Sequence, residues 1–322
     1  MMQMIRTYVM ALVTLACLGP VQADTYPSKP IRLIIGYTPA GAGDFIARIV
    51  GDAMSKELGQ PVLIDNKSGA GGTVSSTLLW RAPPDGYTLG LATGTLYGID
   101  QYLYKMKYTP ANFTPITRLT VSPLVLAVNR EFGTDKLDEL IAKLKAHPGK
   151  FNYASSGIGG SPHIAALTFE KAAGAKLVHI PFKGGAPAIQ AVAAGDVELS
   201  FGTAASVLPL GNQGVVKMLG VTTTQPSPVA PGLPTLASQG LPGFDFTFWF
   251  GLFGPPGMPL EVRDKLFAAA TRALANPQVR EKLLGTGNEA APSSSPAEFN
   301  TWAAAAGRTQ LARIQEANVT LD

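Results

Sequence analysis

The chain has almost no cysteine and little histidine, the residues that most often hold transition metals. Its 322 residues include one cysteine, Cys17, and three histidines, His147, His163 and His179. No two of the histidines stand at a metal-ligand spacing, so we expect neither a transition-metal site nor any other cofactor. Because Cys17 lies in a segment that we expect to be removed, the mature chain would form no disulfide and would depend on its core for stability.

Charged residues are scarce and unclustered. Asp, Glu, Lys and Arg make up 15% of the chain, and the formal net charge is +4. The lysines and arginines form no dense basic run, so the sequence does not predict nucleic-acid binding. Hydrophobic residues make up 46% of the 322 positions, and a chain of this length can bury the cores of two domains.

The apolar run at the N-terminus, residues 8–18, is too short to span a bilayer, which takes about 20 residues. Arg6 precedes this run and small residues follow it at positions 21 and 23, a pattern typical of a cleavable signal peptide. We therefore expect cleavage after Ala23 and a soluble, periplasmic mature protein. Two alternatives stay open: a buried N-terminal helix, or a lipid anchor on Cys17, although the leucine usual three positions before such a cysteine is missing.

Sequence motifs of nucleotide-binding proteins and of common hydrolases are also missing. The glycine turn at residues 36–43 lacks the third glycine of the dinucleotide fingerprint and the Gly-Lys-Ser/Thr ending of a P-loop, and the chain has no G-x-S-x-G elbow. A secreted serine hydrolase that pairs Ser155 or Ser161 with His163 remains the alternative from another class. Against it, Ser161 and His163 are too close in sequence for a usual triad, and Ser161 fits better as a helix N-cap.

Strand–turn–helix units make up the first part of the chain. Residues 31–37 form an apolar run typical of a buried parallel strand, residues 38–43 form a Gly/Pro turn, and a helix with an apolar stripe runs from Asp44 to about residue 58. Strands at 62–66 and 88–92, with a helix at 73–81 between them, continue the pattern. Successive units of this kind predict a parallel sheet with right-handed crossovers.

The middle of the chain repeats this pattern, and the end departs from it. We expect strands at 124–128, 152–154, 177–181, 199–201 and 216–222, with helices at 137–144, 161–173 and 187–195. The tail has an extended aromatic stretch at 244–253 and helices at 259–275 and from 296 onward, which we expect to pack back on the first sheet. The predicted fold is therefore α/β with two lobes, each a mostly parallel sheet flanked by helices. The predicted divisions are a signal peptide (1–23), lobe 1 (24–122), lobe 2 (123–243) and a return to lobe 1 (244–322).

Glycine-rich and hydroxyl-rich turns follow the predicted strands in both lobes. In an open α/β sheet such turns lie at the carboxyl ends of the strands, where ligands bind, and the helix that follows offers unpaired N–H groups to an anion. Each helix terminus stabilises an anion by roughly 0.3–1 kcal/mol, so several together with serine hydroxyls could hold a carboxylate. Lys183 is the one positive charge in such a turn of the second lobe.

The same turns carry short motifs in a fixed order along the chain. These are Tyr26-Pro27-Ser28-Lys29-Pro30-Ile31-Arg32, Pro39-Ala40-Gly41-Ala42-Gly43-Asp44, Asn66-Lys67-Ser68-Gly69-Ala70-Gly71-Gly72, Ala82-Pro83-Pro84-Asp85-Gly86-Tyr87-Thr88-Leu89, Asn152-Tyr153-Ala154-Ser155 and Pro181-Phe182-Lys183-Gly184-Gly185-Ala186-Pro187-Ala188. In this order they resemble the Bug family, the periplasmic solute receptors of tripartite tricarboxylate transporters, over essentially all of the mature chain.

The resemblance implies a monomeric, non-enzymatic receptor whose two lobes close on a small organic acid. It also implies two membrane partners, the large and small subunits of the transporter; a receptor that only senses its ligand stays open as an alternative. By motif position the acid would meet the first turn of lobe 1, the serine/glycine turn of lobe 2 and the lysine turn. The ligand-binding residues that we predict are Tyr37, Thr38, Ala40, Gly41, Gly43, Asp44, Thr93, Gly94, Ser155, Ser156, Gly157, Ser161, His163, Lys183, Gly184, Gly202 and Thr203.

One departure from the family pattern bears on the ligand. Where the family often has an aspartate after a phenylalanine, this chain has Gly202. Without that carboxylate, an amino acid ligand would bury an unpaired ammonium at a cost of several kcal/mol. We therefore predict a mono- or dicarboxylate without an amino group. Glycine also frees volume, and four aromatic residues lie near predicted turns and could flank a flat ligand: Tyr37, Tyr97, Trp249 and Phe250. An aromatic dicarboxylate is therefore a candidate ligand. The alternative is that these four aromatic side chains belong only to the core.

Overall fold

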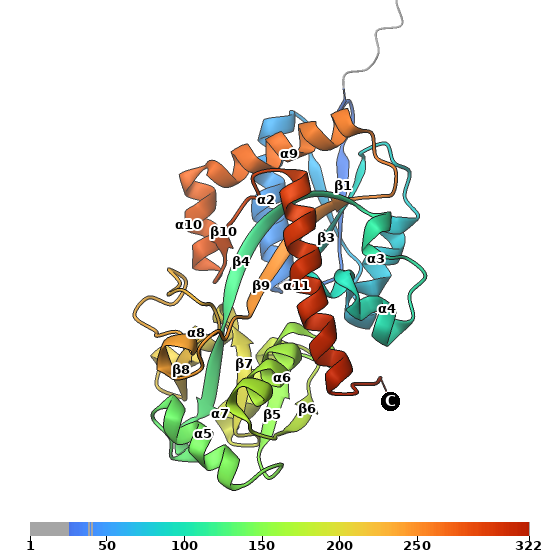
Figure 1. The fold of residues 1–322 in the computed structure, drawn as a ribbon. Coiled ribbons are helices and arrows are strands. Elements are labelled where there is room, and N and C mark those ends of the chain that lie inside the picture. The colour runs from blue at the N-terminus through green and yellow to red at the C-terminus, as the bar shows by residue number, and fades with distance from the viewer. Residues whose placement is uncertain (1–25, 38, 40, 322) are drawn as a thin grey trace, which may run out of the picture.

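The computed structural model describes residues 26–37, 39 and 41–321. The predicted signal peptide and its cleavage site, with Cys17, lie outside these residues, and so do Thr38 and Ala40 of the first glycine turn. Within the part that is described, no helix combines the length and the apolar character that crossing a membrane requires. Figure 1 shows two lobes, one above the other, with a long strand running through both.

The first lobe is built from three strand–helix units, of which the sequence predicts the three strands and the first two helices. Its parallel strands β1 (Ile31–Ile35), β2 (Val62–Asn66) and β3 (Thr88–Ala92) lie in the order β2-β1-β3. The helices after them are α2 (Ala42–Leu58), α3 (Thr73–Trp80) and α4 (Ile99–Tyr104), with one-turn 3-10 helices at η1 (Ala70–Gly72) and η2 (Gly94–Tyr97). Each strand therefore ends in a turn that leads into a helix.

The second lobe repeats this plan. Its parallel strands β5 (Asn152–Ser155), β6 (Val178–Pro181) and β7 (Leu199–Thr203) lie in the order β7-β5-β6. Helix α5 (Leu137–Ala146) precedes β5, and the helices α6 (Ser161–Ala173), α7 (Gly185–Ala194) and α8 (Ala204–Asn212) follow the three strands. Strand β8 (Val216–Val221) completes the lobe and pairs antiparallel with β4.

The strands that cross between the lobes differ from the prediction. The sequence predicted a strand at 124–128, but β4 (Thr114–Asn129) is far longer. Its first part pairs with β9 (Thr247–Gly254) as far as Pro123, and from Leu124 onward it pairs with β7 and β8, always antiparallel. The sheet of each lobe is therefore mixed rather than mostly parallel, because each includes a stretch of a strand that runs through both. The α/β class with two lobes is confirmed.

The C-terminal tail contains one more helix than expected and reaches both lobes. Helix α9 (Leu260–Ala275) is followed by α10 (Pro277–Gly285), which the sequence analysis missed, then by the short strand β10 (Glu289–Ala290) and by α11 (Pro296–Glu316). Asn276 caps α10 by accepting the Gln278 N–H at 2.9 Å. Helix α11 runs down the first lobe to the side of α6 (Figure 1), where Glu316 pairs with Lys171 at 3.0 Å. Three further 3-10 turns complete the described elements: η3 (Pro110–Asn112), η4 (Arg130–Phe132) and η5 (Ala237–Gln239).

Each lobe has a hydrophobic core at its sheet. In the first lobe, alternate residues of β1 pack against the apolar stripe of α2; in the second, Tyr153 of β5 and Phe201 of β7 pack against Phe169 of α6. Tyr153, Phe169 and Phe201 are at most 1% exposed, and burying a large apolar side chain stabilises the fold by about 1.5–3 kcal/mol. The cores hold the strand ends, and the turns that follow them, in place.

Candidate functional site

The first turn of lobe 1 depends on glycines at close approaches. A Cβ on Gly36 would lie 2.6 Å from the Ser75 Oγ, and one on Gly43 would lie 2.4 Å from the Tyr37 ring. Only glycine fits at such distances. Gly41 is the N-cap residue of α2, and its carbonyl oxygen accepts the N–H groups of Asp44 and Phe45. The turn is therefore folded tightly against its own helix and against the start of α3.

Asp44 lies in the first turn of α2, as predicted, but its carboxylate is bound by the lobe itself. The side chain is 4% exposed. Its Oδ2 accepts the Arg48 Nε–H at 2.9 Å, and its Oδ1 accepts an N–H of Asn66 at 2.9 Å. These donors satisfy a negative charge that would otherwise repel an anionic ligand at the helix N-terminus. Asn66 was not among the predicted site residues, although it stands at the end of the predicted second strand.

A small cavity of about 10 Å³ lies among the three turns of lobe 1, with room for roughly one water molecule. Its polar lining residues are Tyr37, Ser75, Ser76, Thr93 and Thr95, and three glycines and three apolar residues complete the lining: Gly36, Gly71, Gly72, Leu91, Ala92 and Leu96. Burial raises the pKa of the Tyr37 phenol, and a hydrogen bond with Thr93 partly offsets this. Neither of these serines nor Thr95 was among the predicted site residues, although all three follow glycine turns.

A buried carboxyl group stands next to this cavity. Asp100, in the first turn of α4, is 2% exposed and accepts the Tyr108 hydroxyl at 3.2 Å. Burial raises the pKa of Asp100 to about 6, against the lowering effect of the Tyr108 and Thr95 hydroxyls. Gly94, one of the predicted ligand-binding residues, lies close to α11: a Cβ there would lie 2.6 Å from the Gln310 Oε1.

Two stacked histidines hold the serine/glycine turn of lobe 2. The rings of His163 and His179 lie 3.9 Å apart at an angle of 19°. The His163 Nδ1 accepts the Gly159 N–H at 3.0 Å, and the His179 Nε2 lies 2.6 Å from the Ser155 Oγ. Burial lowers the pKa of His163 to about 3, with the neighbouring His179 contributing, and lowers that of His179 to about 4. Both rings are therefore neutral at neutral pH and bind the turn as hydrogen-bonding groups.

This arrangement gives the hydrolase alternative little support. Ser155 contacts His179 rather than His163, and it is fully buried, out of reach of a substrate. In the described part of the chain, no aspartate or glutamate hydrogen-bonds to either ring of the histidine pair. The pair therefore positions the turn.

Ser161 has a different place from the one predicted. The N-cap residue of α6 is Gly160; Ser161 is the first helical residue, followed by Pro162, and no side chain caps this helix. Because no side chain makes a cap hydrogen bond at this helix, the expectation that Ser161 caps it is wrong.

We expect Ser161→Ala to change the free energy of unfolding by less than about 0.5 kcal/mol, as for a surface change that removes no cap. Urea unfolding of the variant and the wild type measures this. A loss near 1 kcal/mol, typical of a lost N-cap side chain, would contradict the assignment of the cap to Gly160.

The three turns of lobe 2 lie side by side. A Cβ on Gly157 would lie 3.8 Å from the Phe182 carbonyl oxygen, and one on Gly185 would lie 3.4 Å from the Ser206 Oγ, which itself lies 2.9 Å from the Thr203 Oγ1. Four predicted residues thus follow one edge of the sheet: Ser156, Gly157, Gly184 and Thr203. Lys183 stands exposed in the turn after β6 and has no hydrogen bond or ion pair with the described residues.

Gly202 faces the core. A Cβ on it would lie 2.6 Å from the Ile189 Cδ1 and 2.5 Å from the Val207 Cγ2, and both of these side chains are buried. The prediction that this glycine frees volume for a ligand is wrong, because α7 and α8 fill that volume.

The aromatic residues proposed to flank a flat ligand are mostly core. Trp249 and Phe250 are 1% exposed, and Tyr97 is 6% exposed with its ring near that of Trp249. Tyr37 is only partly buried, and its ring meets Phe250 edge-on at 5.3 Å. Tyr37 alone of these four remains available to contact a ligand.

The two lobes touch at two places near these turns. A Cβ on Gly159, in the serine/glycine turn, would lie 2.3 Å from Leu103 of α4. A Cβ on Gly287, after α10, would lie 2.7 Å from the Ala205 N–H nitrogen at the start of α8. The turns at the strand ends of lobe 2 therefore abut elements of lobe 1.

Among the residues the structure describes, no three His, Cys, Asp or Glu side chains gather where they could hold a metal ion.

Comparison with known sequences points to one family. Residues 46–318 match the family model described as tripartite tricarboxylate transporter family receptor. A protein from the tcbD–tcbE intergenic region of Pseudomonas sp. strain P51 is 35% identical over 263 residues, which cover 81% of this chain and 78% of that protein. BugT of Bordetella pertussis is 31% identical over 282 residues, 86% of each chain.

Solved structures agree with this match. The structure of R. palustris Rpa4515 with adipate has a TM-score of 0.83 and 27% identity and covers 92% of this chain and 99% of that one. MatC from Rhodopseudomonas palustris with bound malate has a TM-score of 0.76 and 30% identity, with 90% and 99% covered. The periplasmic binding protein BugD has a TM-score of 0.79 and 29% identity, with 92% and 99% covered.

Proposed function

The chain belongs to the tripartite tricarboxylate transporter receptor family, and we propose that it is a monomeric periplasmic receptor for a small aliphatic dicarboxylate. It captures the acid between its lobes by closure and delivers it to the large and small membrane subunits of a tripartite tricarboxylate-type transporter. The predicted signal peptide supports the periplasmic location. The family consists of solute receptors, which bind their ligand without turnover.

The observation that carries this proposal is the pair of turn sets at the strand ends, one in each lobe. In lobe 1 the acid of the first turn is bound by Arg48 and Asn66, so the N-terminal end of α2 keeps its positive character. In lobe 2 three turns lie side by side and carry hydroxyls and the exposed Lys183. Such a surface attracts carboxylates without an arginine clamp.

The absence of an amino group in the ligand follows from the acids near these turns. Asp44, the acid of the first turn, is engaged by its own lobe. A ligand ammonium would therefore be buried without a partner. Three of the four aromatics proposed to flank a flat ligand are core, which favours an aliphatic acid over an aromatic one. The adipate and malate held by two related structures fit this choice.

We expect adipate, malate or a similar aliphatic diacid to raise the melting temperature most in a thermal-shift panel. The panel also holds a benzene dicarboxylate, aspartate and glutamate. A ligand at 100 times its Kd stabilises the folded state by about 2.7 kcal/mol, so a true ligand is easily separated from the others. Stabilisation by aspartate or glutamate alone would contradict the proposal, and release of product from an ester panel would favour the hydrolase.

A further inference from the structure

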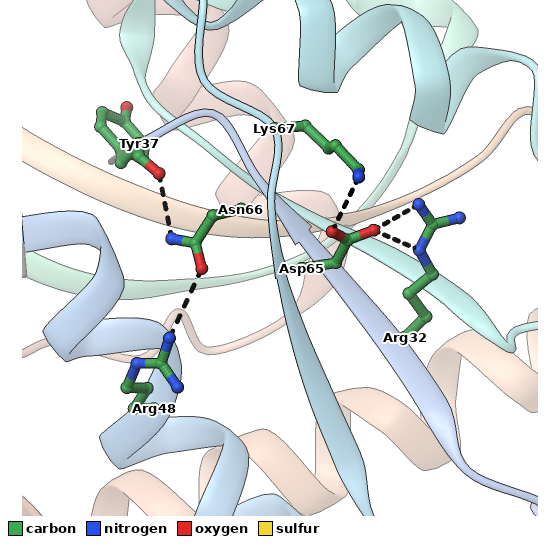
Figure 2. Close-up of polar contacts among 6 residues, drawn as sticks. All are labelled: Arg32, Tyr37, Arg48, Asp65, Asn66 and Lys67. Carbon is green, nitrogen blue, oxygen red and sulfur yellow. Dashed lines mark hydrogen bonds and ion pairs between the residues drawn. The ribbon is translucent and has the colours of Figure 1, made fainter. Parts of the chain in front are cut away.

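The side chain of Asn66 joins both ends of the first glycine turn. Its Nδ2 group donates to the Tyr37 carbonyl oxygen at 3.0 Å and to the Asp44 Oδ1 at 2.9 Å. Its Oδ1 accepts from the Arg48 Nη2 at 3.4 Å. Figure 2 shows the amide between Tyr37 and Arg48, reaching across from strand β2. One side chain of a neighbouring strand thus spans the turn from its start to its helix.

The backbone of Asn66 is itself firmly placed. It is the last residue of β2, paired in register with Ile35, the last residue of β1, and the next N–H, that of Lys67, donates to the Ile35 carbonyl oxygen at 2.7 Å. An amide nitrogen carries two N–H donors, which matches the two acceptors it meets here. Aspartate has the same shape but no donor, and alanine has neither donor nor acceptor.

We propose that Asn66 is the positioning residue of the anion-binding turn in lobe 1. It engages the Tyr37 carbonyl and the Asp44 carboxylate, two acceptors that would repel a ligand carboxylate if they turned toward it. Arg48 forms an ion pair with Asp44, its Nε lying 2.9 Å from the Asp44 Oδ2, and so neutralises the charge of that carboxylate. The inference rests on the proposed function, because it assigns a role in carboxylate binding.

The chain offers a matched control one residue away. Asp65 of β2 accepts the Arg32 Nε–H at 2.7 Å and pairs with the Lys67 Nζ at 3.2 Å. Successive strand residues point to opposite faces, and Figure 2 shows this ion pair apart from the Asn66 bonds. Arg32 and Lys67 are nearly half exposed, and exposed ion pairs contribute little to stability.

The test is calorimetric titration of adipate and malate into the wild type and three variants. We expect Asn66→Ala to weaken binding of the diacid at least about tenfold at pH 7.5, and Asp65→Asn to stay within about twofold of the wild type. Circular dichroism melts report whether each variant is folded. Unchanged affinity of Asn66→Ala, or an equal loss in Asp65→Asn, would overturn the inference.

The third variant, Asn66→Asp, separates positioning from general damage. It sets a second carboxylate against Asp44, so binding should be weaker than in Asn66→Ala at pH 8. Below about pH 6 the two carboxylates can share a proton, which restores a donor, and affinity should recover relative to the wild type. Arg48 keeps its charge, Lys67 is engaged by Asp65, and Asp100 titrates in both proteins alike, so none of these produces the recovery. A constant ratio of affinities from pH 8 to pH 5.5 would contradict the assigned role.

These measurements distinguish failure of the proposed function from failure of the role assigned to Asn66. If the wild type binds neither adipate nor malate nor any other diacid of the panel, the proposed function fails and this role falls with it. If the wild type binds and all three variants match it, only the role of Asn66 is wrong.

Discussion

Lowering the pH from 7 to 5 should destabilise the folded chain through His163 and His179. Burial lowers the pKa of these side chains to about 3 and about 4, whereas an unfolded histidine has a pKa near 6.5. Below pH 6.5 the unfolded state therefore binds more protons than the folded state, and stability falls as the pH falls. The contribution is fully present above pH 6.5 and decreases by about 1.4 kcal/mol per pH unit for each histidine, or about 2 kcal/mol each by pH 5.

Asp100 opposes part of this effect. Its pKa is raised to about 6 by burial, so between pH 6 and its unfolded pKa the folded state binds more protons, and acidification favours folding. Over the step from pH 6 to pH 5 this offsets about 1.4 kcal/mol. We expect a net loss of about 2–3 kcal/mol between pH 7 and pH 5.

Urea unfolding at pH 7, 6 and 5 measures the loss. In His163→Asn the side-chain oxygen can still accept the Gly159 N–H, but the group no longer titrates. One histidine then acts against the unchanged offset from Asp100, so the loss between pH 7 and pH 5 should fall to about a quarter of that of the wild type. His147→Asn is the control, because His147 is exposed and outside the histidine stack. Equal free energies of unfolding at pH 7 and pH 5 in the wild type would contradict the neutral, buried state of the pair.

Replacing Gly159 by alanine should cost both stability and ligand affinity. Gly159 has φ +74°, and a Cβ there would lie 2.3 Å from Leu103 of the other lobe. The left-handed backbone costs an alanine about 1–2 kcal/mol, and overpacking against a buried leucine adds about 1–3 kcal/mol. The contact joins the lobes, so relieving it moves the serine/glycine turn away from lobe 1 and should weaken diacid binding more than about tenfold.

Gly149→Ala separates the two causes. Gly149 has φ +71° and no heavy atom within 4 Å of its added Cβ, so this variant has the backbone strain without the clash. A double variant, Gly159→Ala with Leu103→Val, should show a coupling free energy of about 0.5–3 kcal/mol, as residues in contact do. Equal losses of stability in Gly159→Ala and Gly149→Ala, with unchanged diacid affinity in both, would show that the lobes do not depend on this contact.

The sequence by itself determined the repeating units, the α/β class and the family. Apolar runs of strand length, glycine turns and the apolar stripe after Asp44 are local patterns, and β1, α2 and β2 formed where they predicted. The motifs that carry the resemblance are local as well. A local pattern is sufficient for these features because strand and helix periods, and the turns between them, are properties of neighbouring residues.

Only the tertiary structure decided which groups meet and which way they point. Ser155 and His179 are 24 residues apart and meet because β5 and β6 pair in parallel, and Asn66 reaches the first turn because β2 pairs with β1. Gly202 faces Ile189 and Val207 because of the register of β7, which places every second residue on the core side. The full length of β4 depends on β9, a strand more than a hundred residues away. Pairing and register arise from packing over the whole chain, so no local pattern reveals them.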